Sequence, residues 1–366
     1  MASQFDASVK GRCSEILTDM TNFMKGNAPE YYATKNGTLA AITSNYNVGA
    51  TEIELGQADG TIRRARVRYI SRKTTDAIST DFDDITCGTG TSTVFKETTL
   101  EISEEICIDG GITITENEMK KLCMTNADYQ SWRDRVLMTY INSLHTKLDQ
   151  EILTKISLNC IGVNVKNKTS LGVPLATAKT INVLSGDCKS ACTDGVNELL
   201  IDYEDNEQIG APIIIGQGNW EKLMLNLGYG CCNDYGVDFG KVQSFISSRG
   251  YAFYKDQNAN AILGDDQILV LAPNAVQFVS WNAFDGMEIP WNGSFAHLTM
   301  PDPKYPGLMW DFHLKYNDCT DRNGNGTYWL NLKLMWDVFC APSDVFESSD
   351  PMYGVTGVFR YEATAI

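Results

Sequence analysis

The most regular hydrophobic pattern in the sequence lies between Asn126 and Leu158. Apolar residues recur there every three or four positions, which is the spacing of one face of an α-helix. This face comprises Leu137, Ile141, Leu144, Leu148, Ile152 and Ile156. The opposite face is predicted to carry Arg135, Thr139, Asn142, Thr146, Asp149 and Gln150. No glycine or proline interrupts the run, so we expect a single helix about 45 Å long.

A second apolar row lies beside the main one. Trp132, Val136 and Tyr140 follow one another at steps of four, which places them on a common side of the first half of the helix. His145 lies at the edge of the main face, where a half-buried packing role is expected. The pattern therefore predicts a spine helix across which other elements pack.

Residues 48–72 predict a β-hairpin, because apolar and charged positions alternate on both sides of a turn. The turn signal is Asp59-Gly60, and the returning strand is predicted at Ile62–Ile70. A two-stranded ribbon is marginally stable alone in water. We therefore expect this ribbon to lie against another surface.

The regions on either side of this hairpin have weaker patterns. Residues 1–47 are expected to form an N-terminal arm, with a helix at Val9–Met24 followed by an extended segment. Residues 76–109 are acidic. Strands are predicted at Val94–Lys96, Leu100–Ile108 and Ile112–Thr115.

After Asn159 glycines become frequent, and helical and strand patterns alternate as in a mixed α/β domain. A helix is predicted at Gly195–Asp205, and strands at Ala211–Gly216, Tyr251–Tyr254, Ile268–Leu271 and Val276–Trp281. A turn-rich connection at Pro290–Gly307 leads to two alternating strands, Trp310–Tyr316 and Tyr328–Trp336. Because these strands match the spine helix in length, we expect them to pack on it. From Ser343 onward the chain is expected to be a tail with little core.

The composition is that of a globular protein, with 43% hydrophobic and 21% charged residues. The net charge of −16 argues against a protein that holds nucleic acid through a basic surface. The sequence shows no secretion signal and no run of membrane-spanning length. The eleven cysteines are therefore expected to be reduced thiols in a cytosolic setting.

Motifs for catalysis and cofactor binding are largely missing. No G-x-S-x-G, Walker loop or H-E-x-x-H occurs in the sequence. Gly216-Gln217-Gly218 follows a predicted strand, but Glu221 replaces the third glycine of a dinucleotide fingerprint, so a tight turn is the better interpretation. We expect no catalytic residues and no cofactor.

Two sets of residues offer weak candidates for a metal ion. Asp321, Asn323 and Asn325 match the first half of a calcium loop, but Leu332 stands where a bidentate glutamate is required. A polar hairpin turn is the favoured interpretation. The second set comprises Cys188, Cys192, Cys231 and Cys232, whose spacing fits no standard zinc module.

Asp311 and His313 share a face of one predicted strand. They are compatible with an acid–base pair, but a cross-strand polar contact is favoured because no nucleophile can be placed beside them. Three tryptophans, Trp281, Trp291 and Trp310, allow an aromatic cleft of a cytosolic hydrolase as an alternative function.

The strongest remaining signal is electrostatic. Arg63, Arg64, Arg66 and Arg68 place four of the thirty basic residues within six positions. Glu52 and Glu54 across the ribbon cannot neutralise four guanidinium groups, so further carboxylates are expected from the acidic segment 81–105. If that segment belongs to another copy of the chain, these arginines make intersubunit contacts.

The order of these elements resembles the major capsid proteins of tailed bacteriophages, the Hong Kong 97-like fold shared with encapsulin shells. Local stretches also resemble the axial domain of that family, and the overall character is similar to shells of phages that infect Bacteroidetes. The stretches that resemble the axial domain are Pro212-Ile213-Ile214-Ile215, Asn219-Trp220-Glu221-Lys222-Leu223, Tyr254-Lys255-Asp256, Ile262-Leu263-Gly264 and the run from Ile268 to Pro273.

The resemblance implies an α+β fold with an N-terminal arm (1–47), an E-loop hairpin with an acidic connection (48–99), a peripheral domain with the spine helix (100–159), an axial domain (160–295), and peripheral strands with a C-terminal tail (296–366). It implies a structural, non-enzymatic subunit. Hexamers and pentamers of the chain would form an icosahedral shell in the virion, assembled in the bacterial cytoplasm.

The implied partners are further copies of the chain, a separate scaffolding protein, a portal protein and a decoration protein. Packaged double-stranded DNA would be contacted weakly and without sequence specificity, and no membrane is expected. An encapsulin-like protein compartment is the alternative within the same fold.

Overall fold

The computed structural model describes a defined set of residues. They are 36–44, 52–58, 62–70, 95–115, 126–160, 179–184, 199–204, 210–217, 251–273, 275–282, 289, 292, 295–302, 304–305, 308–317, 327–340 and 357–365. Helices and mixed sheets make the fold α+β. The chain divides into two compact units, the first Met1–Ala33, Ile102–Leu148 and Val279–Asp337, and the second Thr34–Glu101, Asp149–Phe278 and Val338–Ile366.

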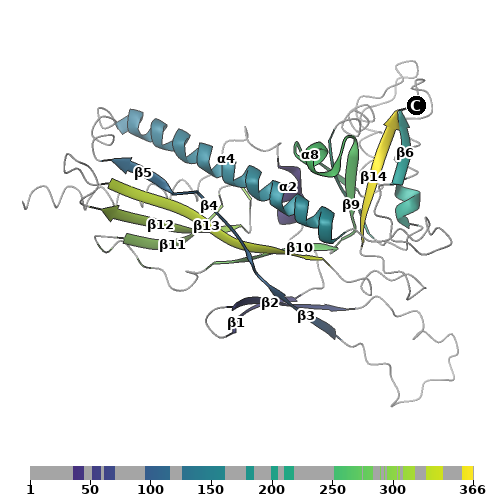
Figure 1. Cartoon of the computed structure of the whole chain (residues 1–366), viewed down its shortest axis with the longest axis horizontal. Coiled ribbons are helices and arrows are strands. Elements are labelled where there is room, and N and C mark those ends of the chain that lie inside the picture. Colours follow the sequence, from purple (N-terminus) through teal and green to yellow (C-terminus); the bar gives the residue numbers. More distant parts are fainter. Residues whose placement is uncertain are drawn as a thin grey trace, which may run out of the picture. The chain divides into compact units, whose positions relative to one another are not determined.

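The spine helix is α4, Asn126–Asn159, which confirms the prediction to within one residue. Figure 1 shows it lying along a six-stranded sheet. The strands of this sheet, in the order β10, β13, β12, β11, are Val276–Trp281, Thr327–Cys340, Met309–Asn317 and Phe295–Pro301; β4, Glu104–Cys107, and β5, Ile112–Thr115, also pair with β13.

Buried apolar residues occur at every second position of β12 and β13 and form the core on one face of this sheet. Trp310, Phe312 and Leu314 are buried on β12, and Leu332 and its even-numbered neighbours are buried on β13. Side chains of period two share one face of a strand, so this row forms the apolar face. The prediction that these strands pack on the spine helix is confirmed in the first unit, where α4 covers the sheet (Figure 1).

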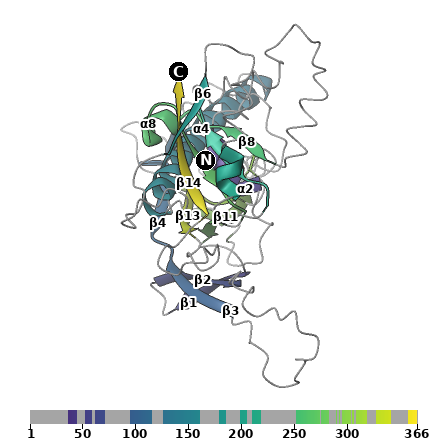
Figure 2. The ribbon, with the colours of Figure 1, turned by 90° about the vertical axis from the view of Figure 1, so that its right-hand side faces the viewer.

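The second unit contains a five-stranded mixed sheet. In the order β6, β14, β9, β7, β8, its strands are Lys179–Leu184, Val358–Ala365, Gln267–Leu271, Ile213–Gly216 and Ala252–Lys255. β14 runs parallel to β6 and antiparallel to β9, and Figure 2 shows it beside β6. The helices α2, Gly37–Ser44, and α8, Ala259–Leu263, belong to the same unit.

Gly216 ends the strand β7 where two strands approach closely. A Cβ atom at this position would overlap the side chain of Ile268 on β9. The glycine is therefore required for packing within the sheet, whereas Gly218 and the expected turn lie outside the described residues.

Three segments differ from the prediction. The tail expected after Ser343 contains β14, in which Val358, Phe359 and Tyr361 are buried. The extended segment expected before Asn47 contains the helix α2. The connection at Pro290–Gly307 contains β11. Each segment is too short to show a clear period of its own, and long-range pairing or packing decides its structure.

The predicted hairpin strands form as β1, Glu52–Ala58, and β2, Ile62–Ile70, which pair antiparallel; the predicted turn at Asp59-Gly60 lies outside the described residues. A third strand, β3, Phe95–Glu101, pairs antiparallel with β2. We call β1, β2 and β3 the arm sheet. The third strand was not foreseen as a partner of the ribbon, although its acidic segment was.

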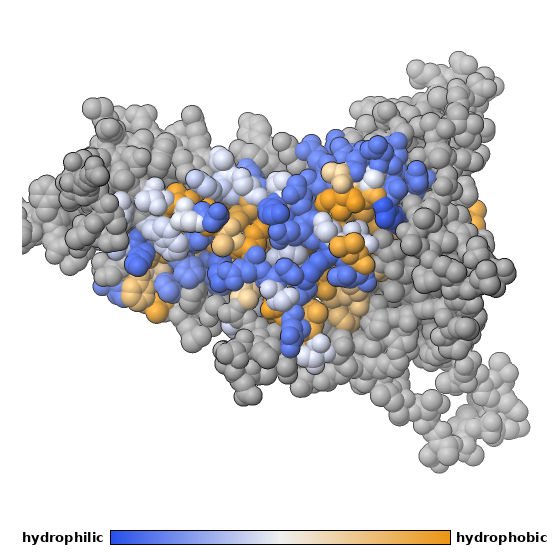
Figure 3. Space-filling view, in the orientation of Figure 1, coloured by the Kyte–Doolittle hydropathy of each residue, from blue (hydrophilic) through white to orange (hydrophobic). Residues whose placement is uncertain are grey.

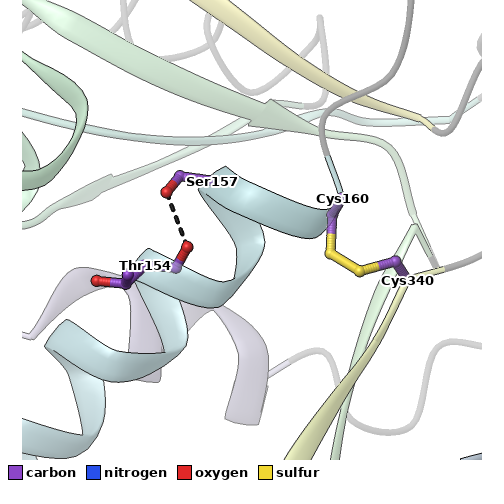
Figure 4. Close-up of a disulfide and its surroundings, with 4 residues drawn as sticks. All are labelled: Thr154, Ser157, Cys160 and Cys340. Atoms are coloured by element: carbon purple, nitrogen blue, oxygen red, sulfur yellow. Dashed lines mark hydrogen bonds between the residues drawn. A yellow bond between two sulfur atoms is a disulfide. The ribbon is translucent and has the colours of Figure 1, made fainter.

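A disulfide joins Cys160, just after α4, to Cys340 at the end of β13, with the two Cα atoms 5.2 Å apart (Figure 4). Cys160 is fully buried, and its amide nitrogen donates to the carbonyl of Ile156 (3.0 Å), which continues the helix to the cysteine. The expectation that all cysteines are reduced thiols is therefore wrong for this pair. Cys107 is an exposed free cysteine.

Candidate assembly arm and buried polar centres

The arm sheet has one charged face. In an antiparallel sheet, residues directly opposite one another share a face. The register places Arg68 between Glu52 and Glu97, Arg66 between Glu54 and Thr99, and Arg64 between Gly56 and Glu101. We call this set the charged face of the arm sheet. Arg63 lies opposite Gln57 on the other face.

The charged face brings together three arginines and four glutamates of one chain. Two of these glutamates, Glu97 and Glu101, lie on β3 and come from the acidic segment that the sequence pointed to. Opposite charges across strands contribute about 0.2–1 kcal/mol per pair. The register therefore aligns the arginines with acidic positions of the same subunit.

The other face of the arm sheet has an apolar centre, with Arg63 and Gln57 near one end. The register aligns Ile53 with Val67 and Leu55 with Ala65, and Leu100 lies on the far side of Ala65. Ala65 is fully buried. One apolar and one charged face is the usual pattern of an antiparallel sheet that covers other structure with one side.

His145 of α4 is held in a buried polar centre. Its Nε2 lies 2.6 Å from Oδ2 of Asp302, and both side chains are at most 1% exposed. Trp310 Nε1 donates to the same oxygen (2.7 Å), and the amides of Lys304 and Tyr305 donate to Oδ1 (2.8 Å each). His145 is thus fully buried rather than half-buried as expected.

The carboxylate of Asp302 accepts hydrogen bonds from most of the donors around it. Burial alone would raise the pKa of its carboxyl group, but the hydrogen bond and charge of His145, with the donors Trp310 and Tyr305, outweigh this and lower the pKa. Buried ion pairs of this kind fix a geometry rather than adding much stability. The centre is closed to solvent, so it fixes α4 on the sheet rather than acting on a substrate.

A second buried centre involves two carboxyl groups, Asp149 of α4 and Asp256 after β8, both fully buried. Asp149 accepts from the amide of Leu39 (2.8 Å) and from Nδ2 of Asn258 (2.9 Å). Asp256 accepts from the amide of Thr38 (3.0 Å), from the hydroxyl of Thr38, and from the amide of Asn258 (2.8 Å). Asp149 was predicted on the polar face of the helix, and that placement is wrong.

The pKa of Asp149 is raised to about 8, first by burial and then by the charge of Asp256. Burial beside a second carboxyl group therefore favours the protonated form of Asp149 at neutral pH. Gly37 makes the close approach possible, because a Cβ there would overlap the carbonyl of Lys255 and lie 3.0 Å from Cβ of Asp256.

The remaining histidines, His297 and His313, lie opposite each other on β11 and β12, with ring centroids 4.7 Å apart. Burial, followed by the charges of His297 and Lys333, lowers the pKa of His313 to about 4. Asp311 is fully buried and lies opposite Thr299, in the next cross-strand pair on the same face. Thr299 Oγ1 donates to Asp311 (3.4 Å), so the predicted cross-strand polar contact of Asp311 is confirmed. The sequence pattern did not single out His297, because it lies on β11, in a segment that was expected to be a turn-rich connection.

The metal candidates of the sequence lie outside the described residues. This applies to Asp321, Asn323 and Asn325, and to Cys188, Cys192, Cys231 and Cys232. Within the described residues, no group of three or more His, Cys, Asp or Glu side chains is placed to hold a metal ion.

Of the three tryptophan candidates for a hydrolase cleft, Trp281 is partly buried at the end of β10. Trp291 lies outside the described residues. Trp310 is fully buried in the core and bonded to Asp302, so it does not line a cleft. Among the helices that the structure describes, none has the length and apolar character of a membrane span.

Comparison with known proteins gives no family model and no curated protein that matches the chain. Solved structures with some similarity include the capsid of Myoviridae phage XM1, with a TM-score of 0.37, 13% identity, and coverage of 89% of this chain and 90% of that chain. The capsid of Staphylococcus phage Andhra has a TM-score of 0.39 and 9% identity, with coverage of 93% of this chain and 84% of that chain. A structure of Mycobacterium phage Che8 has a TM-score of 0.35 and 12% identity, with coverage of 93% of this chain and 90% of that chain. TM-scores this low carry no weight for the function.

Proposed function

We propose that the chain is the major capsid protein of a tailed bacteriophage, which assembles into hexamers and pentamers of an icosahedral shell around the genome. The observation that carries the proposal is the succession of elements along the chain. A three-stranded arm sheet with a charged face is followed by a 34-residue helix, a mixed sheet and two long antiparallel strands. The Hong Kong 97-like fold that the sequence resembles has this order.

The chemistry of the described residues supports a structural role. The two buried centres, His145 with Asp302 and Asp149 with Asp256, are closed to solvent and join separate segments of the chain. The net charge of −16 suits an inner surface that does not bind packaged DNA tightly. Figure 3 shows several separate hydrophobic patches among hydrophilic residues on the described part of one face.

In this role, Arg63, Arg64, Arg66 and Arg68 of the arm sheet contact a neighbouring subunit, and the partners are further copies of the chain with scaffolding, portal and decoration proteins. The direct test of assembly is electron microscopy of the purified protein. Closed shells or capsomer rings are the expected result, and a monodisperse monomer under all conditions would contradict the proposal.

The role of the arginines needs a test that separates contacts within the arm sheet from contacts between subunits. In one variant, Arg64, Arg66 and Arg68 are changed to Glu; in a control, the same three residues are changed to Lys. Charge reversal is expected to leave a folded subunit, checked by its melting temperature, that assembles poorly. The lysine control keeps the charge and is expected to assemble.

A third variant combines the three Arg→Glu changes with Glu52, Glu54, Glu97 and Glu101 changed to Arg. This swap restores opposite charges across the strands of the arm sheet but inverts the charge that the face presents to a neighbour. If the arginines contact another subunit, the swapped protein folds but does not form shells. Normal shells from the swapped protein would show that the arginines act through these four glutamates and not through other carboxylates of a neighbouring subunit.

A further inference from the structure

Two of the three histidines in the chain form a cross-strand pair in the first unit. His297 of β11 lies directly opposite His313 of β12 in the antiparallel register. Their ring centroids are 4.7 Å apart and the ring planes are inclined by 55°. Both residues are partly exposed, so an ion in solution can reach the pair.

The backbone around His297 shows which type of cross-strand pair this is. Its amide and carbonyl groups both bond to Ile289, at 2.9 Å each, on the side away from β12. In an antiparallel sheet, the amide and carbonyl groups of one residue both point toward the same neighbouring strand. With the strand on its opposite side, that residue forms a non-hydrogen-bonded pair. In such pairs the Cα atoms are about 4.5 Å apart and the side chains approach most closely.

We propose that His297 and His313 together bind one divalent transition-metal ion of the nickel, copper or zinc class, each through one ring nitrogen. Imidazole is a preferred ligand of these ions, with metal–nitrogen distances of about 2.0–2.1 Å for zinc. Two rings whose centroids are 4.7 Å apart can both direct a nitrogen to one ion after small rotations about their side-chain bonds. Water completes the coordination.

The neighbours of the pair define the environment of the ion. The ring of Phe295 lies 5.1 Å from that of His297 and shields one side. Asp311, in the next cross-strand pair on the same face, is already engaged by Thr299 and Asn282. The nearby Lys333 forms an ion pair with Glu105 (2.7 Å), which offsets its repulsion of a cation. With two protein ligands, the site binds more tightly than a single histidine but less tightly than a three-ligand centre.

The binding test uses the full-length protein and NiCl₂, because nickel favours imidazole ligands. Isothermal titration is expected to give one saturable site per chain. His297→Ala and His313→Ala are each expected to weaken nickel binding by about tenfold or more, because the second ligand acts at high effective concentration. Lys315→Ala, an exposed change on the same strand as His313, is the matched control and should retain the affinity.

A second measurement on the unaltered protein guards against variants that fold poorly and against binding by the cysteines. Diethyl pyrocarbonate modifies accessible imidazoles, and mass spectrometry can assign the products because the chain has only three histidines. Nickel is expected to protect His297 and His313 together. Equal modification with and without nickel, or equal nickel affinity in the wild type and both histidine variants, would overturn the proposal.

Discussion

Asp149 shows how a single side chain can contradict the periodicity of its helix. It lies next to Leu148 of the apolar face, and the spacing places it among polar positions. The structure buries it completely, because the amide of Leu39 and the side chain of Asn258 supply hydrogen bonds from segments more than a hundred positions away in the chain. Sequence periodicity predicts which face of a helix is apolar, but it does not predict hydrogen-bond partners from segments that are distant in the sequence.

The raised pKa of Asp149 leads to a prediction about pH. In the folded chain the group keeps its proton up to about pH 8, whereas its usual value is 3.8. Its contribution to stability is therefore fully present below about pH 4, falls above that, and is lost as the pH rises through about 8. The slope is at most about 1.4 kcal/mol per pH unit.

Asp149→Asn should flatten this dependence, because the amide stays neutral at every pH. The measurement is the free energy of unfolding from pH 5 to pH 9 for both proteins. Tyr140→Phe, a change on the partly exposed side of the same helix, serves as the control and should keep the wild-type slope. An Asp149→Asn protein with the wild-type slope would assign the proton to another group.

Asp302 carries a second prediction at this scale. Asp302→Ala removes the acceptor of Trp310, of two backbone amides and of His145. Leaving buried donors without partners is expected to lower the free energy of unfolding by about 3–5 kcal/mol. Denaturant unfolding measures this change. A loss below about 1 kcal/mol would mean that water enters the centre and replaces the carboxylate.

At the scale of elements, the helices and strands with the longest hydrophobic periodicity are the ones that the sequence predicts best. α4 and the strands β12 and β13 carry long, uninterrupted periods, and their existence and packing follow from the sequence. The hairpin of β1 and β2 follows from its turn signal. β14 pairs with β9, which lies far away in the chain, and β11 pairs with the next strand, β12, but lies in a turn-rich segment that conceals its alternation. The candidate sites follow the same division, since the arginines of β2 are visible in the sequence and the pair of His297 and His313 is not.

The disulfide between Cys160 and Cys340 links the end of α4 to the end of β13 across 180 residues. A covalent link of this span restricts the unfolded chain and typically contributes about 2–4 kcal/mol. The double change Cys160→Ser and Cys340→Ser, or treatment with a reducing agent, should lower the unfolding free energy by this amount. Cys107→Ser, at an exposed free cysteine, is the control and should have little effect.

At the scale of the whole molecule, some of the apolar side chains that the structure describes are exposed to solvent. Leu158 is 76% exposed and Ile201 is 52% exposed. Isolated exposed apolar residues are common, so their role depends on the proposed shell. Leu158→Asp is expected to leave the melting temperature of the subunit unchanged and to reduce shell formation, as seen by electron microscopy and sedimentation. Thr154→Asp, at another exposed position of the same helix, is the control.

The position of β14 has a consequence for the timing of synthesis. β6 ends at Leu184, whereas β14, the neighbour of β6 in the sheet, begins at Val358. At ribosomal rates of roughly 5–20 residues per second, β14 emerges some ten to thirty-five seconds after β6. During that interval β6 and one edge of β9 lack their partner, and unpaired edges invite pairing with other chains. A cell making many copies at once therefore holds nascent chains whose sheet is still open, and this edge can pair with other chains until synthesis reaches β14.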